Sequence, residues 1–173
     1  MNASHAKAIP FDEVMYHSGS HCKTCDLPKP ARSKHCKICN VCIHEFDHHC
    51  VWINGCVSRS NYLRFLVFAG THAFVTLYGS YLLLGAQFGA IRKRYDENLF
   101  LLDVFTYYEL FFAFIDQCIL FGYEHKVITL LAICCISLSI ALPVFVGYHL
   151  RNLIQNFTTN ERYKVSQLEF GLR

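Results

Sequence analysis

Residues 45–52 read E-F-D-H-H-C-V-W, which places two histidines and an acid directly beside Cys50. A histidine near a cysteine lowers a thiol pKa or takes the thiol proton, and a carboxylate orients that histidine and stabilises its cation. The pattern therefore predicts a nucleophilic Cys50 served by a histidine, with Asp47 supporting the base. The same side chain types also bind zinc, so the pattern leaves open that His48 and Cys50 are metal ligands.

Seven of the ten cysteines lie between Cys22 and Cys56, and their CxxC spacing indicates metal binding rather than disulfides. A CxxC turn lets two thiolates share one metal at about 2.3 Å each, and four nitrogen or sulfur ligands close a structural zinc site. Two such sites would use six of these cysteines and two histidines, which leaves one cysteine for other work. Cys50 is the best candidate because it stands outside any CxxC pair and follows His48 and His49, with Asp47 before them. Beyond the CxxC spacing, no internal repeat is apparent.

Two long apolar segments must anchor these residues. Hydrophobic residues make up 53% of the 173-residue chain, and residues 65–91 and 127–150 contain no Asp, Glu, Lys or Arg. About 27 helical residues extend roughly 40 Å, enough to cross a bilayer with some tilt. Pro143 would kink the second segment without excluding a transmembrane helix. We expect transmembrane helices at 63–91 and 127–150.

The segment between the two spans is apolar but carries Asp103, Glu109 and Asp116. Each acid costs a few kcal/mol near a bilayer centre. We therefore interpret residues 92–126 as lumenal or interfacial, with a helix or re-entrant segment, and we keep a third span as the alternative.

The distribution of basic residues predicts the orientation of the chain. Residues 1–64 and the tail after Leu150 hold twelve of the sixteen Lys and Arg residues, which the positive-inside rule places in the cytosol. The predicted fold is mainly α and integral to the membrane, with a cytosolic, loop-rich cysteine domain stabilised by zinc. Its expected parts are a polar segment (1–20), the cysteine-rich domain (21–62), the two spans and a cytosolic tail (151–173).

The complete pattern of residues resembles a known family. From Cys22 to Cys56 the chain reads C-x2-C-x9-H-C-x2-C-x2-C-x4-D-H-H-C-x5-C, with K-P-A-R-S-K-H-C at 29–36 and T-T-N-E at 158–161. This set resembles the DHHC protein S-acyltransferases, or palmitoyltransferases. Val51 and the K-P-A-R-S-K-H-C segment look most like the branch that acylates SNARE proteins at the endoplasmic reticulum and Golgi.

The resemblance implies a division of labour among the candidate residues. Cys50 would be the nucleophile, His48 its base, Asp47 the residue that orients the base, and Thr159 a supporting residue that reaches Asp47. The implied zinc ligands are Cys22, Cys25, His35 and Cys42 at one site, and Cys36, Cys39, His49 and Cys56 at the other. The two structural zinc ions would hold loops that have no core of their own.

The resemblance also implies the co-substrate and the partners. A fatty acyl-CoA such as palmitoyl-CoA would acylate Cys50, which would pass the chain to a membrane protein with a juxtamembrane cysteine. We expect Lys29, Arg32 and Lys34 to meet CoA phosphates or anionic headgroups, and Trp52, Phe65 and Phe68 to line the acyl path. Nucleic-acid binding is disfavoured, because the positive-inside rule already accounts for the basic residues.

Members of that family usually have two further spans before the cysteine-rich domain. This chain begins about twenty polar residues before Cys22, so we interpret it as a truncated form. The alternative to an active S-palmitoyltransferase is a catalytically impaired, membrane-tethered zinc-binding scaffold.

Overall fold

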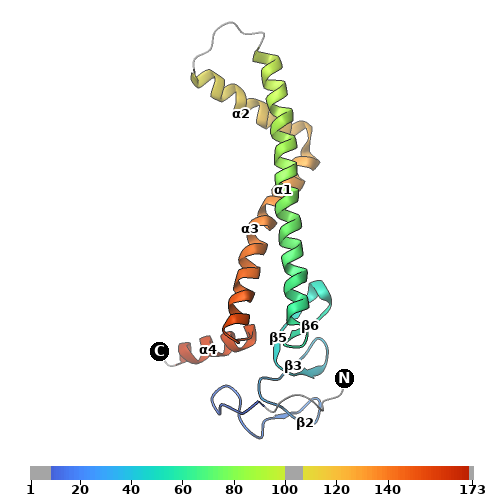
Figure 1. The fold of residues 1–173 in the computed structure, drawn as a ribbon, viewed down its shortest axis with the longest axis vertical. Helices are drawn as coiled ribbons and strands as arrows, with labels where there is room; N and C mark the ends of the chain where they lie inside the picture. Colours follow the sequence, from blue (N-terminus) through green and yellow to red (C-terminus); the bar gives the residue numbers. More distant parts are fainter. Residues whose placement is uncertain (1–8, 100–106, 172–173) are drawn as a thin grey trace. The chain divides into compact units, whose positions relative to one another are not determined.

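The computed structural model describes residues 9–99 and 107–171. The chain forms two compact units, Met1–Phe68 with Gly147–Arg173, and Ala69–Val146. Figure 1 shows its elements in chain order, which are β1 (His21–Cys22), β2 (Leu27–Pro28), β3 (Lys34–Cys36), β4 (Val41–Ile43), β5 (Phe46–Cys50), the 3-10 helix η2 (Val51–Ile53), β6 (Gly55–Ser58), α1 (Tyr62–Leu99), α2 (Tyr107–Glu124), α3 (Lys126–Ile154) and α4 (Thr159–Gly171).

The first unit contains three short hairpins, and they repeat one plan every 14 residues. Strands β1–β2, β3–β4 and β5–β6 pair antiparallel. The equivalent cross-strand pairs are His21↔Pro28, His35↔Cys42 and His49↔Cys56. A histidine followed by a cysteine therefore ends the first strand of each hairpin, at the same register. The sequence expectation of no repeat beyond the CxxC spacing was therefore wrong. The repeat is hidden in the sequence, because the third copy has Ile53 where the others have the second cysteine of a CxxC.

The hairpin turns explain why the repeat folds in the same way each time. Asp26, Asn40 and Asn54 have φ values of 53°, 52° and 46°, in the left-handed region. Asn and Asp are the residues besides glycine that adopt this conformation most readily. The turn chemistry therefore recurs with the same 14-residue spacing as the ligands.

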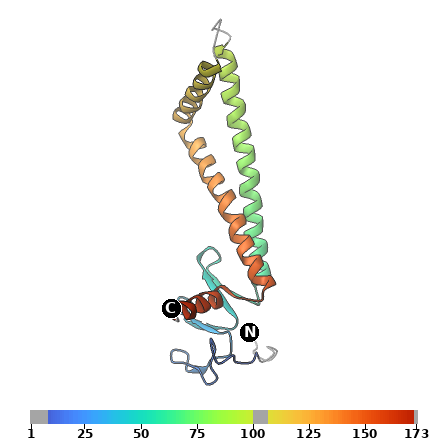
Figure 2. The same ribbon diagram turned by 90° about the vertical axis from the view of Figure 1, so that its left-hand side faces the viewer.

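The third hairpin supports the core of the first unit. Cys50, Val57, Tyr62, Phe65 and Leu66 form one buried cluster, so the beginning of α1 packs on this hairpin. Helix α4 lies against β5, as Figure 2 shows. A short apolar core thus surrounds the cysteine that the sequence singles out.

The structure confirms two helices long and apolar enough to cross a membrane, Tyr62–Arg94 and Lys126–Ile154. Helix α3 continues through Pro143, as expected. Large apolar side chains such as Val127, Ile140 and Val144 are exposed along α3, as lipid-facing positions would be.

Within the second unit, α2 occupies much of the segment predicted to be interfacial, and only α1 and α3 meet the length and composition of a span in the described part of the chain. Gln87 donates a hydrogen bond to the Ile128 carbonyl (3.2 Å), and Arg94 pairs with Glu124 (2.8 Å). Asp103 lies outside the described residues.

Candidate active site and metal centres

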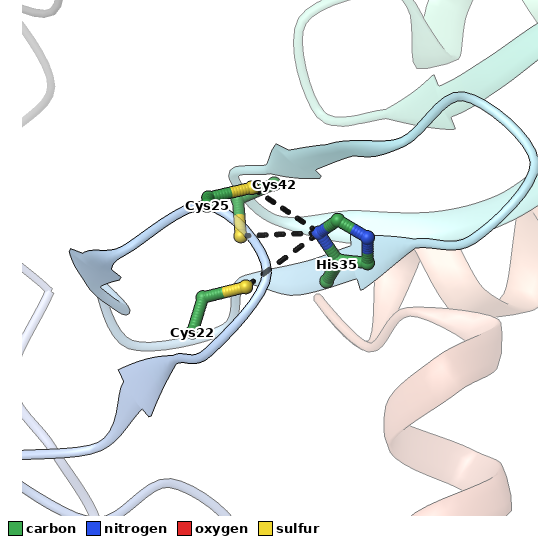
Figure 3. A group of neighbouring side chains, drawn as sticks. All are labelled: Cys22, Cys25, His35 and Cys42. Carbon is green, nitrogen blue, oxygen red and sulfur yellow. Dashed lines mark hydrogen bonds between the residues drawn. The ribbon is translucent and has the colours of Figure 1, made fainter.

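The first predicted ligand set comes together at one point (Figure 3). The sulfur atoms of Cys22, Cys25 and Cys42 lie 3.6, 3.3 and 3.8 Å from Nδ1 of His35. Tetrahedral zinc with Zn–S near 2.3 Å and Zn–N near 2.0 Å separates its ligand atoms by about 3.5 Å. The donor set and its spacing therefore fit a structural zinc ion.

The second set has the same geometry. Cys36, Cys39 and Cys56 place their sulfur atoms 3.7, 3.4 and 3.7 Å from Nδ1 of His49. The sulfur atoms of Cys39 and Cys56 are 3.5 Å apart. Both clusters are compatible with zinc, and each carries three thiols and one imidazole.

The pKa values of the cluster thiols reflect how closely these groups lie together. The backbone N–H of Cys25 helps to lower the pKa of Cys22 to about 7. Burial, together with neighbouring thiols, raises the pKa of Cys42 to about 12. Several thiolates at one point repel each other, and a divalent cation removes that cost.

The hairpin repeat explains the partition of the ligands. Each cluster joins the CxxC of one hairpin to the cross-strand His–Cys pair of the next hairpin. Cys50 occupies in the third hairpin the place that Cys22 and Cys36 occupy in the first two. No further hairpin of this kind follows among the described residues, so neither cluster includes Cys50.

Asp47 and His48, which precede Cys50 in β5, form a close pair. Nδ1 of His48 lies 2.7 Å from Oδ2 of Asp47. Burial raises the pKa of Asp47, but hydrogen bonds from His48 and Thr159 outweigh it and hold that pKa below its usual value. An ionised carboxylate only accepts, so Nδ1 carries the proton and Nε2 is the basic nitrogen.

Cys50 lies on the same face of β5 as His48, because side chains alternate along a strand. It is 7% exposed and packs in the apolar cluster with Val57, Tyr62 and Phe65. The ring of Phe65 meets the ring of His48 edge-on, with centroids 5.1 Å apart. A base and a thiol thus share one strand face in largely apolar surroundings, an arrangement suited to nucleophilic attack on an apolar acyl group.

Thr159 reaches Asp47, but through its backbone. Its N–H donates to Oδ1 of Asp47 at 2.8 Å. Thr158 and Glu161 form a reciprocal capping box, in which the Thr158 N–H donates to the Glu161 carboxylate (2.8 Å) and the Glu161 N–H donates to the Thr158 hydroxyl (3.2 Å). The box exposes the Thr159 N–H at the first turn of α4, where the helix dipole favours the Asp47 anion.

His149 is a member of this site that the sequence expectations left out. It is 2% exposed, and its Nδ1 lies 2.8 Å from the hydroxyl of Tyr62. Its ring centroid is 5.4 Å from that of His48. No signal in the sequence could have found it, since it lies about a hundred residues from His48 within an apolar helix.

The residues expected to bind acyl-CoA are placed differently from one another. Lys29 and Lys34 line a cavity of about 360 Å³ together with Lys164, and no acid is among the lining residues that the structure describes. Trp52, in η2, is 84% exposed. Phe65 is buried, and Phe68 is 37% exposed.

Arg32 does not share the cavity of the two lysines, because its guanidinium pairs with Glu161 and Glu45. These carboxylates are the contacts that the structure shows for Arg32, and the expected phosphate contact stays a prediction.

Comparison with known proteins identifies the family. The family model of the DHHC palmitoyltransferases matches residues 15–166, which includes both metal clusters, Cys50, the two apolar helices and the capping box. A search of curated proteins found no significant match. Family membership and the two apolar helices make this an integral membrane protein. The chain belongs to the DHHC palmitoyltransferases, a family of protein S-acyltransferases that use acyl-CoA.

Proposed function

We propose that this chain is an acyl-CoA-dependent protein S-palmitoyltransferase that works by a ping-pong mechanism on Cys50. The observation that carries the proposal is the position of Cys50, which is buried outside both metal clusters, on the face of β5 that also carries His48 of the Asp47–His48 pair. A thiol that has a general base available and is not a metal ligand is suited to nucleophilic catalysis.

In the first step, His48 takes the proton of Cys50 on Nε2. The thiolate attacks the carbonyl carbon of the acyl-CoA thioester, the bond to the CoA sulfur breaks, and the CoA thiolate receives the proton from His48. Asp47 stabilises the imidazolium while it exists, and the Thr159 N–H keeps the carboxylate in place.

In the second step, the same base serves the substrate protein. The substrate thiol gives its proton to His48 and attacks the thioester on Cys50, whose sulfur leaves and regains the proton. One thioester replaces another, so the two states are nearly equal in energy. Catalysis therefore depends on thiolate generation and positioning.

The apolar surroundings of Cys50 support a path for the acyl chain. Phe65 forms part of the buried cluster around Cys50. We assign Trp52 and Phe68 to the same acyl path. The cavity with Lys29 and Lys34 suits the CoA phosphates, and Lys164 adds a third ammonium group to its wall.

Two structural zinc ions would hold the hairpins, bound by Cys22, Cys25, His35 and Cys42, and by Cys36, Cys39, His49 and Cys56. The basic residues support a cytosolic zinc domain (21–62) and tail (151–173), with spans at 63–91 and 127–150. The substrates would be membrane proteins with juxtamembrane cysteines. The K-P-A-R-S-K-H-C segment supports the endoplasmic reticulum or Golgi branch of the family.

Self-acylation tests the proposal directly. Purified, zinc-loaded protein in detergent is incubated with alkynyl palmitoyl-CoA, and hydroxylamine-labile label is measured. We expect label on the wild type, none on Cys50→Ser, and about 10²- to 10⁴-fold slower labelling of His48→Ala, since a general base contributes that much. Cys118→Ser, in α2, is the matched control and should label like the wild type.

Two outcomes would contradict the proposal. Undiminished label on Cys50→Ser would show that another residue is the nucleophile. A wild type that binds two zinc ions but takes no label would favour the zinc-binding scaffold.

A further inference from the structure

Arg32 occupies a junction between the metal-binding hairpins and the active site. It lies between β2 and β3, three residues before His35 and four before Cys36, which belong to different clusters. Its φ of 61° is in the left-handed region, so the backbone is held in an uncommon conformation there. Only 14% of its side chain is exposed.

The side chain of Arg32 contacts three other residues of this chain. Nε and Nη2 donate to the two carboxylate oxygens of Glu161 at 2.5 and 2.7 Å, which is a bidentate ion pair. Nη2 also donates to the carbonyl of Asn156 at 2.8 Å, and Nη1 lies 3.6 Å from Glu45. The backbone carbonyl of Arg32 accepts from Phe46, the first residue of β5, at 3.2 Å.

Glu161 carries this link to the catalytic carboxylate. It is 3% exposed, and one of its oxygens also accepts from the Thr158 N–H as half of the capping box. That box fixes the first turn of α4, whose Thr159 N–H donates to Asp47. A continuous set of contacts therefore runs from Arg32 through Glu161 and the N-terminus of α4 to Asp47.

The alternative role for Arg32 is a contact with CoA phosphate. Two carboxylates already surround the guanidinium, and an incoming phosphate would have to displace them or accept their repulsion. Lys29 is different, because it lines a cavity that has no acid among its described lining residues. The two basic residues thus offer a direct comparison between positioning and binding.

We propose that Arg32 is a positioning residue, which couples the metal-bound hairpins to the active site by holding the N-terminus of α4 against Asp47. The inference rests on the proposed acyl transfer through Cys50. Loss of the Arg32–Glu161 pair would leave a buried carboxylate without its partner and displace the Thr159 N–H. The rate of acyl transfer would fall while the affinity for acyl-CoA remained.

Two acyl donors separate positioning from phosphate binding. Self-acylation kinetics are measured with palmitoyl-CoA and with palmitoyl-N-acetylcysteamine, a thioester that lacks the CoA phosphates. We expect Arg32→Gln to lower kcat about 10- to 100-fold with both donors at unchanged KM, since small displacements of catalytic groups have effects of this size. The matched control Lys29→Gln should raise KM for palmitoyl-CoA only.

Further variants keep the test valid if Arg32→Gln loses its zinc. Arg32→Lys keeps the charge but cannot form the bidentate pair, so kcat should be intermediate and KM unchanged. Glu161→Gln combined with Arg32→Gln should be no slower than the slower of the two single variants, because both remove the same interaction. Zinc content is measured for each variant and should stay at two per chain.

The contrary result is equally definite. If Arg32→Gln or Arg32→Lys raises KM for palmitoyl-CoA and reacts at the wild-type rate with the truncated donor, Arg32 is a phosphate contact and the inference is wrong. Independent, multiplicative losses in the double variant would also overturn it. Absence of label on the wild type with palmitoyl-CoA would instead count against the proposed function.

Discussion

At the scale of single residues, Asp47 combines two properties that normally oppose each other, burial and charge. It is 2% exposed, and burial by itself favours the neutral acid. Hydrogen bonds from His48 and Thr159 nevertheless hold its pKa below the usual value. The carboxylate therefore stays ionised in the neutral pH range, and its support for His48 is lost only as the pH falls through the lowered pKa.

Replacing Asp47 by Asn tests the need for that charge. The amide keeps the size of the side chain but cannot stabilise the His48 cation, so we expect self-acylation to slow about 10²- to 10⁴-fold. KM for palmitoyl-CoA should change little, because Asp47 lies away from the cavity with Lys29 and Lys34. Labelling time courses at several palmitoyl-CoA concentrations, between pH 6 and 8, measure the self-acylation rate and KM. A near-normal rate would show that the mechanism does not need the Asp47 carboxylate.

At the scale of elements, the N-terminus of α4 supports the active site by donating a hydrogen bond to Asp47. The capping box satisfies the Thr158 and Glu161 N–H groups, which leaves the Thr159 N–H for Asp47. The motif T-T-N-E thus has two separable functions. Its outer residues fix the helix start, and Thr159 donates a hydrogen bond from its backbone to Asp47.

Thr159→Pro isolates that backbone donor. Thr159 is the first helical residue of α4, where proline is well tolerated, so the helix should persist without the N–H. Loss of a hydrogen bond to a charged group costs about 1.5–3 kcal/mol, which corresponds to roughly 10- to 150-fold in rate if Asp47 moves.

Thr159→Ala keeps the N–H and is the matched control, for which we expect less than about a fivefold change in rate. The self-acylation rate and the helical content by circular dichroism are measured for both variants. Equal defects in the Pro and Ala variants would show that the hydroxyl, not the backbone, supports Asp47.

At the scale of the whole molecule, the two metal clusters join three hairpins in series. Each hairpin has only two strands, and a two-stranded hairpin is marginally stable by itself. The energy of metal binding therefore becomes folding energy for this part of the chain. The apolar helices α1 and α3 need no such support in a membrane.

Removing both ions with a strong chelator should abolish self-acylation while the far-UV circular dichroism of the helices is largely retained. The active-site hairpin β5–β6 loses its anchor, whereas the helices keep their own hydrogen bonds. Activity should return when zinc is added back. Full activity in protein shown to be metal-free would contradict the role given to the clusters.

The sequence alone predicts those features that depend on residues close together in the chain, namely the metal-ligand residues and the two apolar helices. Ligands such as His35 and Cys42 lie close along the chain, and a hairpin brings them together whatever the rest of the fold does. The two apolar helices likewise follow from composition over a single segment. The partition of the ligands came from the resemblance to the family, and the 14-residue repeat supplies its physical reason.

Only the tertiary structure decided which distant groups complete the active site. Arg32 and Glu161 are separated by 129 residues, and His48 meets His149 across a comparable distance in the chain. Such contacts depend on how α4 and the end of α3 pack against the third hairpin, and no spacing in the sequence encodes that packing. The sequence determined that one thiol is left over from metal binding, the resemblance to the family assigned that role to Cys50, and the packing decided what surrounds it.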